Sequence, residues 1–330
     1  MNPSEVLEIS DRITNEVARL VIGKDAALKK VLGAIIAGGH VLIEDVPGLA
    51  KTLIARSFAR VMDLRFSRIQ FTPDLLPGDI TGSSMFDQEL RRFEFLPGPV
   101  FANLILADEI NRASPRTQSA LLEAMQEQHV TVDGATRTIE SPFIVLATQN
   151  PIDFEGTYPL PEAQLDRFMV RLSIGYPSVD AEIDIVLSRR DRRGDELDLR
   201  RIVSGAEVTG LQQAAEEIYL DRSIAAYIVA IVGETRTDNR VEIGASPRGT
   251  LALFKMSRAN AMISGRDFVT PDDVQEVAAE VLSHRLVLKP EYWARHTDPA
   301  DIVATAVASC PVPGPVDRGA EEAAANAKRP

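Results

Sequence analysis

A short apolar run, a tight turn and a helix-forming segment follow one another near the start of the chain. The apolar run, residues 41–43, is typical of a strand that is buried on both faces. Pro47 and Gly48 mark the turn, and Lys51 and Thr52 open the segment that suits a helix. Backbone N–H groups in a turn of this kind, together with the helix start, bind phosphate oxygens. The stretch therefore predicts a phosphate-binding loop.

The general pattern for such a loop, G-x-x-x-x-G-K-[ST], is met only in part. Asp45 and Ala50 occupy its two glycine positions. Gly48 can ease the turn in place of the first glycine, whereas the methyl group of Ala50 stands where backbone approaches phosphate. In this pattern Lys51 binds the β- and γ-phosphates, and the hydroxyl of Thr52 binds Mg²⁺. The alternative is the solvated start of an ordinary helix, so the other motifs must decide.

Length and composition narrow the class of protein. A chain of 330 residues favours two domains, and a 45% hydrophobic fraction supplies their cores. Cys310 is the single cysteine, which excludes a disulfide framework and a cysteine-built zinc site. Residues 1–20 are amphipathic and charged rather than a signal peptide, and we expect a cytoplasmic protein. The net charge of −12 argues against a broad nucleic-acid-binding face.

Two further strands end in polar residues. Leu104-Ile105-Leu106 predicts a buried strand, and Asp108 and Glu109 follow at its carboxyl end, where ligands bind in a parallel sheet. Asp108 would bind Mg²⁺, and Glu109 would orient and deprotonate the attacking water. The strand within residues 142–150 ends in Asn150, which could position that water. The alternatives are an acidic turn and a turn residue before proline.

Two arginines are candidates for phosphate contacts. Arg167 is followed by Phe168, so one side chain points outward while the other packs. An outward arginine at a subunit edge can serve a neighbouring nucleotide, although a plain surface arginine is the alternative. Ser246 and Pro247 start a helix, which places Arg248 in its first turn. We expect Arg248 to reach a phosphate across a cleft between two domains.

Patterning divides the chain into three parts. Residues 1–175 read as an α/β domain, residues 176–310 as a helical domain, and residues 311–330 as a disordered tail. A stretch rich in proline and glycine, about 77–99, contains two short strand signals and predicts a hairpin inserted into the first domain. Long insertions inside compact domains are more often functional than structural.

Four segments together resemble the MoxR family of AAA+ ATPases. They are Asp-Val-Pro-Gly-Leu-Ala-Lys-Thr (45–52), Leu-Ala-Asp-Glu-Ile-Asn-Arg-Ala-Ser-Pro (106–115), Ala-Thr-Gln-Asn-Pro (147–151) and Leu-Pro-Glu-Ala-Gln-Leu-Asp-Arg-Phe (160–168). The resemblance extends from about Asp11 to about Leu286. It implies an α/β class fold, with a P-loop AAA+ core whose parallel sheet is flanked by helices, followed by a small all-α lid domain. Ala50 is a tolerated variant in this family's loop.

The resemblance also assigns roles to single residues. Glu109 would be the catalytic member of the Walker B pair, Asn150 sensor 1, Arg167 a finger acting on a neighbour, and Arg248 sensor 2. Mg²⁺ would be held by Thr52 and Asp108. The implied ATP-binding loop consists of Asp45, Val46, Pro47, Gly48, Leu49, Ala50, Lys51, Thr52 and Leu53.

Members of the family resemble chaperones in their behaviour, which sets expectations for partners. They form homo-oligomeric rings, usually hexamers, and remodel or activate client or adaptor proteins, which often carry a von Willebrand factor A domain. The hairpin insert would face the pore of the ring. Two alternatives stay open: a nucleic-acid-directed AAA+ motor, and a nucleotide-gated scaffold that binds ATP with little turnover. Arg91 and Arg92 in the insert favour the first, and the intact Asp108-Glu109 pair opposes the second.

Substitutions in these motifs separate ATP binding from hydrolysis. We expect Glu109→Gln to bind ATP but to hydrolyse it slowly, because the water loses its base. Lys51→Ala should weaken binding itself, because it removes the phosphate-binding ammonium. Nucleotide titration and phosphate release on the same preparations measure both. Normal turnover by the glutamine variant would show that Glu109 does not activate water.

Overall fold

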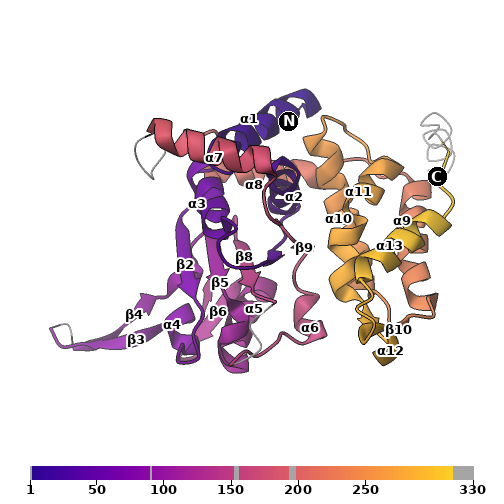
Figure 1. The fold of residues 1–330 in the computed structure, drawn as a ribbon. Coiled ribbons are helices and arrows are strands. Elements are labelled where there is room, and N and C mark those ends of the chain that lie inside the picture. The colour runs from indigo at the N-terminus through magenta and orange to yellow at the C-terminus, as the bar shows by residue number, and fades with distance from the viewer. Residues whose placement is uncertain (1, 90, 152–155, 193–197, 315–330) are drawn as a thin grey trace, which may run out of the picture.

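The computed structural model describes residues 2–89, 91–151, 156–192 and 198–314, and Figure 1 shows the fold. From residue 315 on, the tail that the sequence predicts lies outside the described residues. None of the helices described is long and apolar enough to cross a membrane. The α/β part lies beside a helical part in which the described chain ends (Figure 1).

A five-stranded parallel sheet forms the centre of the α/β part. Its strand order is β2-β5-β8-β1-β9, and each neighbouring pair is parallel. The strands are β1 (Val41–Glu44), β2 (Phe66–Gln70), β5 (Leu104–Asp108), β8 (Ile144–Gln149) and β9 (Val170–Leu172). Because all five run the same way, one edge of the sheet collects every carboxyl end, and the opposite edge collects every amino end.

Helices cover both faces of this sheet, which explains its apolar sequence. Val41 and Ile43 pack into one hydrophobic cluster with α1, α2 and α3, while Leu42 packs into a second cluster with α4 and α5. Strands buried on both faces read as continuous apolar runs. The helices of the α/β part are α1 (Pro3–Ala18), α2 (Asp25–Ile36), α3 (Lys51–Val61), α4 (Pro77–Thr81), α5 (Pro115–Glu127) and α6 (Glu162–Leu165), with 3₁₀ helices η1 (Pro99–Phe101) and η2 (Ile110–Arg112).

The chain beyond β9 is helical apart from one short antiparallel strand pair. Its helices are α7 (Val179–Arg192), α8 (Gly205–Glu216), α9 (Arg222–Thr237), α10 (Pro247–Ile263), α11 (Pro271–Leu282), α12 (Pro290–Trp293) and α13 (Pro299–Ser309), with η3 (Ser283–Arg285). The strand pair is β10 (Val241–Ile243) with β11 (Val287–Leu288). Proline at the first turn after a polar N-cap begins α10, α11 and α13.

The helical part shares its core with the α/β part. One continuous cluster of buried side chains includes Val17 of α1, Val31 of α2, Met256 of α10 and Val277 of α11. The side chain of Gln212 in α8, which lies with α7 over the α/β part (Figure 1), donates to the carbonyl oxygen of Ile35 at 2.8 Å. Because this cluster is unbroken, separating the two parts would expose apolar surface at a cost in free energy.

Two β-hairpins extend from the α/β part. One pairs β3 (Gly82–Asp87) with β4 (Arg92–Pro97), and the other pairs β6 (His129–Val132) with β7 (Ala135–Thr138). The short strands predicted within the insert fall inside β3 and β4. The first hairpin projects away from the sheet (Figure 1). The guanidinium of Arg137 lies 3.8 Å from the ring centre of Phe95, so the second hairpin braces the first.

We expect Gly82→Ala to destabilise the projecting hairpin at its base. Gly82 has φ +88°, and an added Cβ would lie 2.2 Å from the carbonyl oxygen of Leu96. Strain and overlap together should cost about 2 kcal/mol or more, measured by urea unfolding and by proteolysis of the hairpin. Gly78→Ala is the matched control, because open space surrounds that position. Equal behaviour of the two variants would contradict the close approach.

Candidate nucleotide-binding site

The carboxyl edge of the sheet gathers most of the residues that the sequence singled out. Lys51 follows β1, Asp108 ends β5, and Asn150 follows β8, which lies between those two strands. Burial lowers the pKa of the Lys51 ammonium, and the carboxylates of Asp45, Asp108 and Glu109 partly offset this effect. The Lys51 ammonium therefore lies close enough to these three carboxylates to interact with them, as residues of one site would.

The turn before α3 presents backbone rather than side chains. Pro47, Gly48 and Ala50 are exposed, while Lys51 and Thr52 at the helix start are partly buried. Val46, Leu49 and Leu53, the other members predicted for this loop, are also partly buried. The turn itself ends in a left-handed conformation, because Gly48 has φ +90° and Ala50 has φ +56°.

Alanine stands at a left-handed position in this turn where the general pattern has glycine. A methyl group there costs roughly 1–2 kcal/mol. The methyl of Ala50 points to solvent, and the side chain of Lys51 folds back so that its Nζ donates to the carbonyl oxygen of Asp45 at 2.5 Å. The turn thus joins two residues of positive φ to the start of a helix, which is compatible with the predicted phosphate-binding loop.

Thr148 binds both acidic residues at the end of β5, Asp108 through its carboxylate and Glu109 through its backbone N–H. The hydroxyl of Thr148 in β8 donates to Asp108 Oδ1 at 2.7 Å and accepts the Glu109 N–H at 2.8 Å. Glu109 has φ +56°, a left-handed conformation that costs a non-glycine residue free energy. The hydrogen bond from its N–H to Thr148 helps to stabilise this conformation of Glu109. The change of backbone conformation between Asp108 and Glu109 turns their side chains in different directions.

The side chain of Glu109 is held by residues that the sequence analysis missed. Its Oε2 accepts from Gln70 Nε2 at 3.0 Å and from Arg112 Nη1 at 3.2 Å. Gln70 ends β2, and its place in an alternating strand gave no signal that could have marked it. Arg68 of the same strand donates to Asp108 Oδ2 at 2.6 Å. Strand β2 therefore supplies partners to both carboxylates.

The residues present fit a magnesium ion held together with a phosphate. The described residues contain no group of three histidine, cysteine or acidic side chains that could hold a metal. Magnesium is usually bound by one or two protein oxygens together with waters and substrate phosphates. Thr52 and Asp108 supply an oxygen each. Asp108 Oδ1 accepts one hydrogen bond, from Thr148, and keeps acceptor capacity, whereas Oδ2 already accepts two from Arg68.

The two predicted phosphate-binding arginines lie at the opposite edge of the sheet. Arg167, Arg248 and Lys255 line a pocket of about 250 Å³ together with residues 38–40, which precede β1. All four residues of β1 separate this pocket from the phosphate turn, a distance of roughly 13 Å. Arg248 thus lies beside Arg167 rather than beside its own phosphate turn, and its contact with a phosphate stays a prediction.

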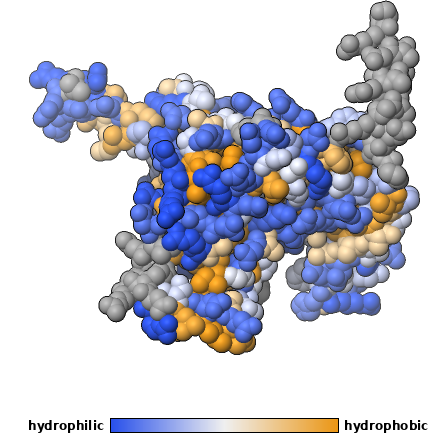
Figure 2. Space-filling view, turned by 90° about the horizontal axis from the view of Figure 1, so that it is seen from above, coloured by the Kyte–Doolittle hydropathy of each residue, from blue (hydrophilic) through white to orange (hydrophobic). Residues whose placement is uncertain are grey.

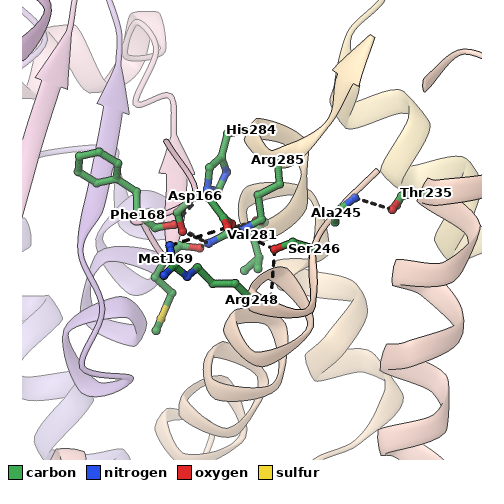
Figure 3. Close-up of polar contacts among 10 residues, drawn as sticks. All are labelled: Asp166, Phe168, Met169, Thr235, Ala245, Ser246, Arg248, Val281, His284 and Arg285. Carbon is green, nitrogen blue, oxygen red and sulfur yellow. Dashed lines mark hydrogen bonds and ion pairs between the residues drawn. The ribbon is translucent and has the colours of Figure 1, made fainter. Parts of the chain in front are cut away.

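A buried arginine explains why the arginines gather there. Arg285 is 2% exposed in its side chain, and its Nε donates to Asp166 Oδ1 at 2.7 Å. Its Nη2 also donates to the carbonyl oxygen of Phe168 at 2.6 Å. Figure 3 shows these contacts between η3, which belongs to the helical part or lid, and the segment before β9. Arg285 thereby fastens the lid to the amino edge of the sheet.

The same aspartate holds the start of α10. Ser246 Oγ, the N-cap of that helix, donates to Asp166 Oδ2 at 3.2 Å, and Arg248 Nη1 lies 4.0 Å from that oxygen (Figure 3). Arg167 is the neighbour of Asp166 in the chain, and its Nε is buried without a hydrogen-bond partner among the described residues. Asp166 thus brings Arg167 and Arg248 together, although they are far apart in sequence.

Comparison with known proteins identifies the family. Residues 40–170 match the model described as "ATPase family associated with various cellular activities (AAA)", and residues 233–306 match the AAA lid domain model. The chain is 48% identical to the uncharacterized protein YeaC of Bacillus subtilis, with 85% of this chain and 87% of that protein covered. It is 44% identical to chaperone MoxR1 of Mycobacterium tuberculosis, with 89% and 79% covered. The chain belongs to the MoxR family of AAA+ ATPases.

A solved structure confirms the arrangement of this MoxR-family chain. A crystal structure of a candidate ATPase from Cytophaga hutchinsonii superposes with a TM-score of 0.88 at 38% identity. The alignment covers 94% of this chain and 97% of the other. The AAA+ core with a following lid, which the sequence predicted, is therefore confirmed.

We expect Asp166→Ala to destabilise this MoxR-family protein by about 3 kcal/mol, because it leaves the buried guanidinium of Arg285 without its counter-ion. Urea unfolding followed by circular dichroism measures the change. Glu140→Ala is the control, since it breaks an exposed pair with Arg65 that should contribute less than about 1 kcal/mol. Similar losses for both variants would show that the buried pair does not anchor the lid.

Proposed function

We propose that this protein is a Mg²⁺-dependent ATP hydrolase that works as a ring and remodels or activates partner proteins. The observation that carries the proposal is the division of the candidate machinery between the two edges of the sheet. Lys51, Asp108 and Glu109 lie at the carboxyl edge, and Arg167 and Arg248 lie at the amino edge. A chain with this arrangement needs a second copy to complete its site.

The carboxyl edge supplies binding and water activation. The turn of residues 45–50 and the Lys51 ammonium bind the phosphates of ATP. Magnesium held by Thr52 and Asp108 would neutralise charge on the β- and γ-phosphates. Glu109, oriented by Gln70 and Arg112, takes a proton from the attacking water, and the side chain of Asn150 orients that water.

The amino edge supplies positive charge to a neighbour. The pocket there is lined by Arg167, Arg248, Lys255 and Arg285 against the single carboxylate of Asp166, so its excess charge is positive. Such a surface attracts a triphosphate presented by an adjacent subunit. Arginine fingers of this kind accelerate hydrolysis by about 10³–10⁵-fold. A closed ring, which we propose to be a hexamer, gives every site both edges.

The projecting hairpin supports a polypeptide as the client. Met85, Phe86, Phe93 and Leu96 are exposed, and the rings of Phe86 and Phe93 pack edge to face with centres 5.3 Å apart. Figure 2 shows an apolar stem and a hydrophilic tip on this projection. An exposed apolar surface fits protein side chains better than a phosphate backbone. The relative named chaperone MoxR1 agrees with a protein client, for which a von Willebrand factor A domain is a candidate.

Mixing two inactive variants tests the shared site. Arg167→Ala should lower the ATPase rate about 10³-fold, and Glu109→Gln should lower it at least about 10²-fold. In random mixed rings, about one interface in four combines an intact Glu109 with an intact Arg167, so mixing should restore about a quarter of wild-type activity. Phosphate release measures the recovery, and the wild-type specific activity should rise with protein concentration.

The controls for this experiment are each variant mixed with itself at the same total concentration. A mixture no more active than its components, or a wild-type rate independent of concentration and of Arg167, would mean that the site is complete within one chain. The ring proposal would then fail, although ATP hydrolysis could stand.

A further inference from the structure

Asp45 occupies the first position of the phosphate turn, where the general pattern has glycine. Its backbone does not need glycine, because the positive φ angles in this turn belong to Gly48 and Ala50. Asp45 is nevertheless buried, with 7% of its surface exposed. Burying a carboxylate costs free energy unless it is hydrogen-bonded or paired. The contacts of this carboxylate therefore indicate why it is there.

The Asp45 carboxylate binds one short segment of chain that is distant in sequence. Ser173 Oγ donates to Oδ1 at 2.9 Å, and the Ile174 N–H donates to Oδ2. The Gly175 N–H is shared between the two oxygens at 3.3 and 3.4 Å. Hydrogen bonds to a charged acceptor are stronger than neutral ones. Asp45 thus clamps residues 173–175 against the phosphate turn.

The other side of that segment is held as well. Lys24 Nζ donates to the carbonyl oxygens of Ile174 at 2.9 Å and Gly175 at 2.8 Å. The segment is therefore fixed through its N–H groups by a carboxylate and through its carbonyl groups by an ammonium. A surface connection without a role of its own rarely needs a buried carboxylate and a partly buried ammonium.

Asp45 also contacts the nucleotide machinery through its backbone. Its carbonyl oxygen accepts from Lys51 Nζ at 2.5 Å, and its N–H donates to the carbonyl oxygen of Gln149, the residue before Asn150. The Lys51 ammonium has three donors, so a phosphate oxygen that accepts from it changes the geometry and strength of the hydrogen bond to that carbonyl. Asp45 therefore contacts Lys51 through its backbone carbonyl and residues 173–175 through its side chain.

Strand β9 connects the clamped segment at one edge of the sheet to the segment that contains Arg167 at the other. The clamped segment directly follows β9, and Arg167 lies just before β9 at the other end. The strand has three residues and spans roughly 10 Å. Figure 1 shows the chain passing from α6 through β9 and on to α7. A shift of residues 173–175 can therefore reach Arg167 along one short extended strand.

We infer that Asp45 is a positioning residue that couples phosphate in a subunit's own turn to the arginine finger that this subunit offers to its neighbour. The path runs from Lys51 through Asp45 and residues 173–175 to β9. The inference rests on the proposed function, because it requires that the turn binds the phosphates of ATP. It adds a route by which one site in a ring can influence the next.

Asp45→Gly tests the inference sharply, because it restores the general loop pattern while removing the clamp. Because Asp45 belongs to the turn that is proposed to bind phosphate, the affinity of this variant for the non-hydrolysable analogue AMP-PNP with Mg²⁺ is measured first, and exchange is then compared at saturating analogue. Amide hydrogen exchange in peptides covering residues 167–178 should slow on AMP-PNP binding in wild type. In Asp45→Gly it should be about tenfold faster without nucleotide and should no longer respond to it.

Two further variants keep the test decisive. Ser173→Ala removes one donor without touching the turn, and we expect an intermediate rise in exchange with unchanged AMP-PNP binding. Asp198→Asn is the matched charge control, because Asp198 forms an exposed pair with Arg60 at 3.2 Å. It should leave both exchange and binding as in wild type.

The outcomes separate failure of the coupling from failure of the proposed function. An equal nucleotide response in wild type and Asp45→Gly, or no response in wild type that binds AMP-PNP, overturns the coupling alone. Wild-type protein that binds no AMP-PNP overturns the proposed function and with it the coupling. Loss of AMP-PNP binding in Asp45→Gly together with wild-type behaviour of Ser173→Ala would make Asp45 a part of the loop itself, and would also overturn the inference.

Discussion

The parallel direction of all five strands is the constraint on which the candidate site depends. Parallel strands place every following loop at one edge, so that Lys51, Asp108 and Asn150 meet although long segments separate them in sequence. The same rule sends every preceding segment to the opposite edge, which is where Arg167 lies. A single chain therefore has two chemically different edges, one with the predicted phosphate-binding turn and carboxylates and one rich in cations.

The lid is placed by polar contacts as much as by its apolar packing. Arg285 binds a carboxylate and several backbone carbonyls in the segment before β9, and its burial makes the loss of any partner costly. Asp166 in turn holds the start of α10. The lid is thus fixed where Arg248 joins Arg167, away from its own phosphate turn. This ion pair and the shared apolar core together hold the lid on the side of the sheet where it supplies charge.

The short strand β9 gives this division a physical connection. Its amino end follows the arginine, and its carboxyl end is clamped to the phosphate turn by Asp45. In the ring that we propose, the shortest route within a subunit between its own nucleotide and its neighbour's crosses the sheet. The replacement of a loop glycine by aspartate, which weakens the sequence pattern, thereby acquires a structural reason.

The sequence by itself determined the elements, the family and the residues of the carboxyl edge, because buried strands, N-caps and motif order are local patterns. It also identified Arg167 and Arg248 as candidates. It could not reveal the roles of Gln70, Arg285 or the Asp45 carboxylate, since their partners lie far away in sequence and nothing in their neighbourhood differs from ordinary surface or strand residues. Only the tertiary structure decided which edge of the sheet receives the lid, because that depends on contacts between residues distant in sequence, among them the shared apolar core and the pair of Asp166 and Arg285.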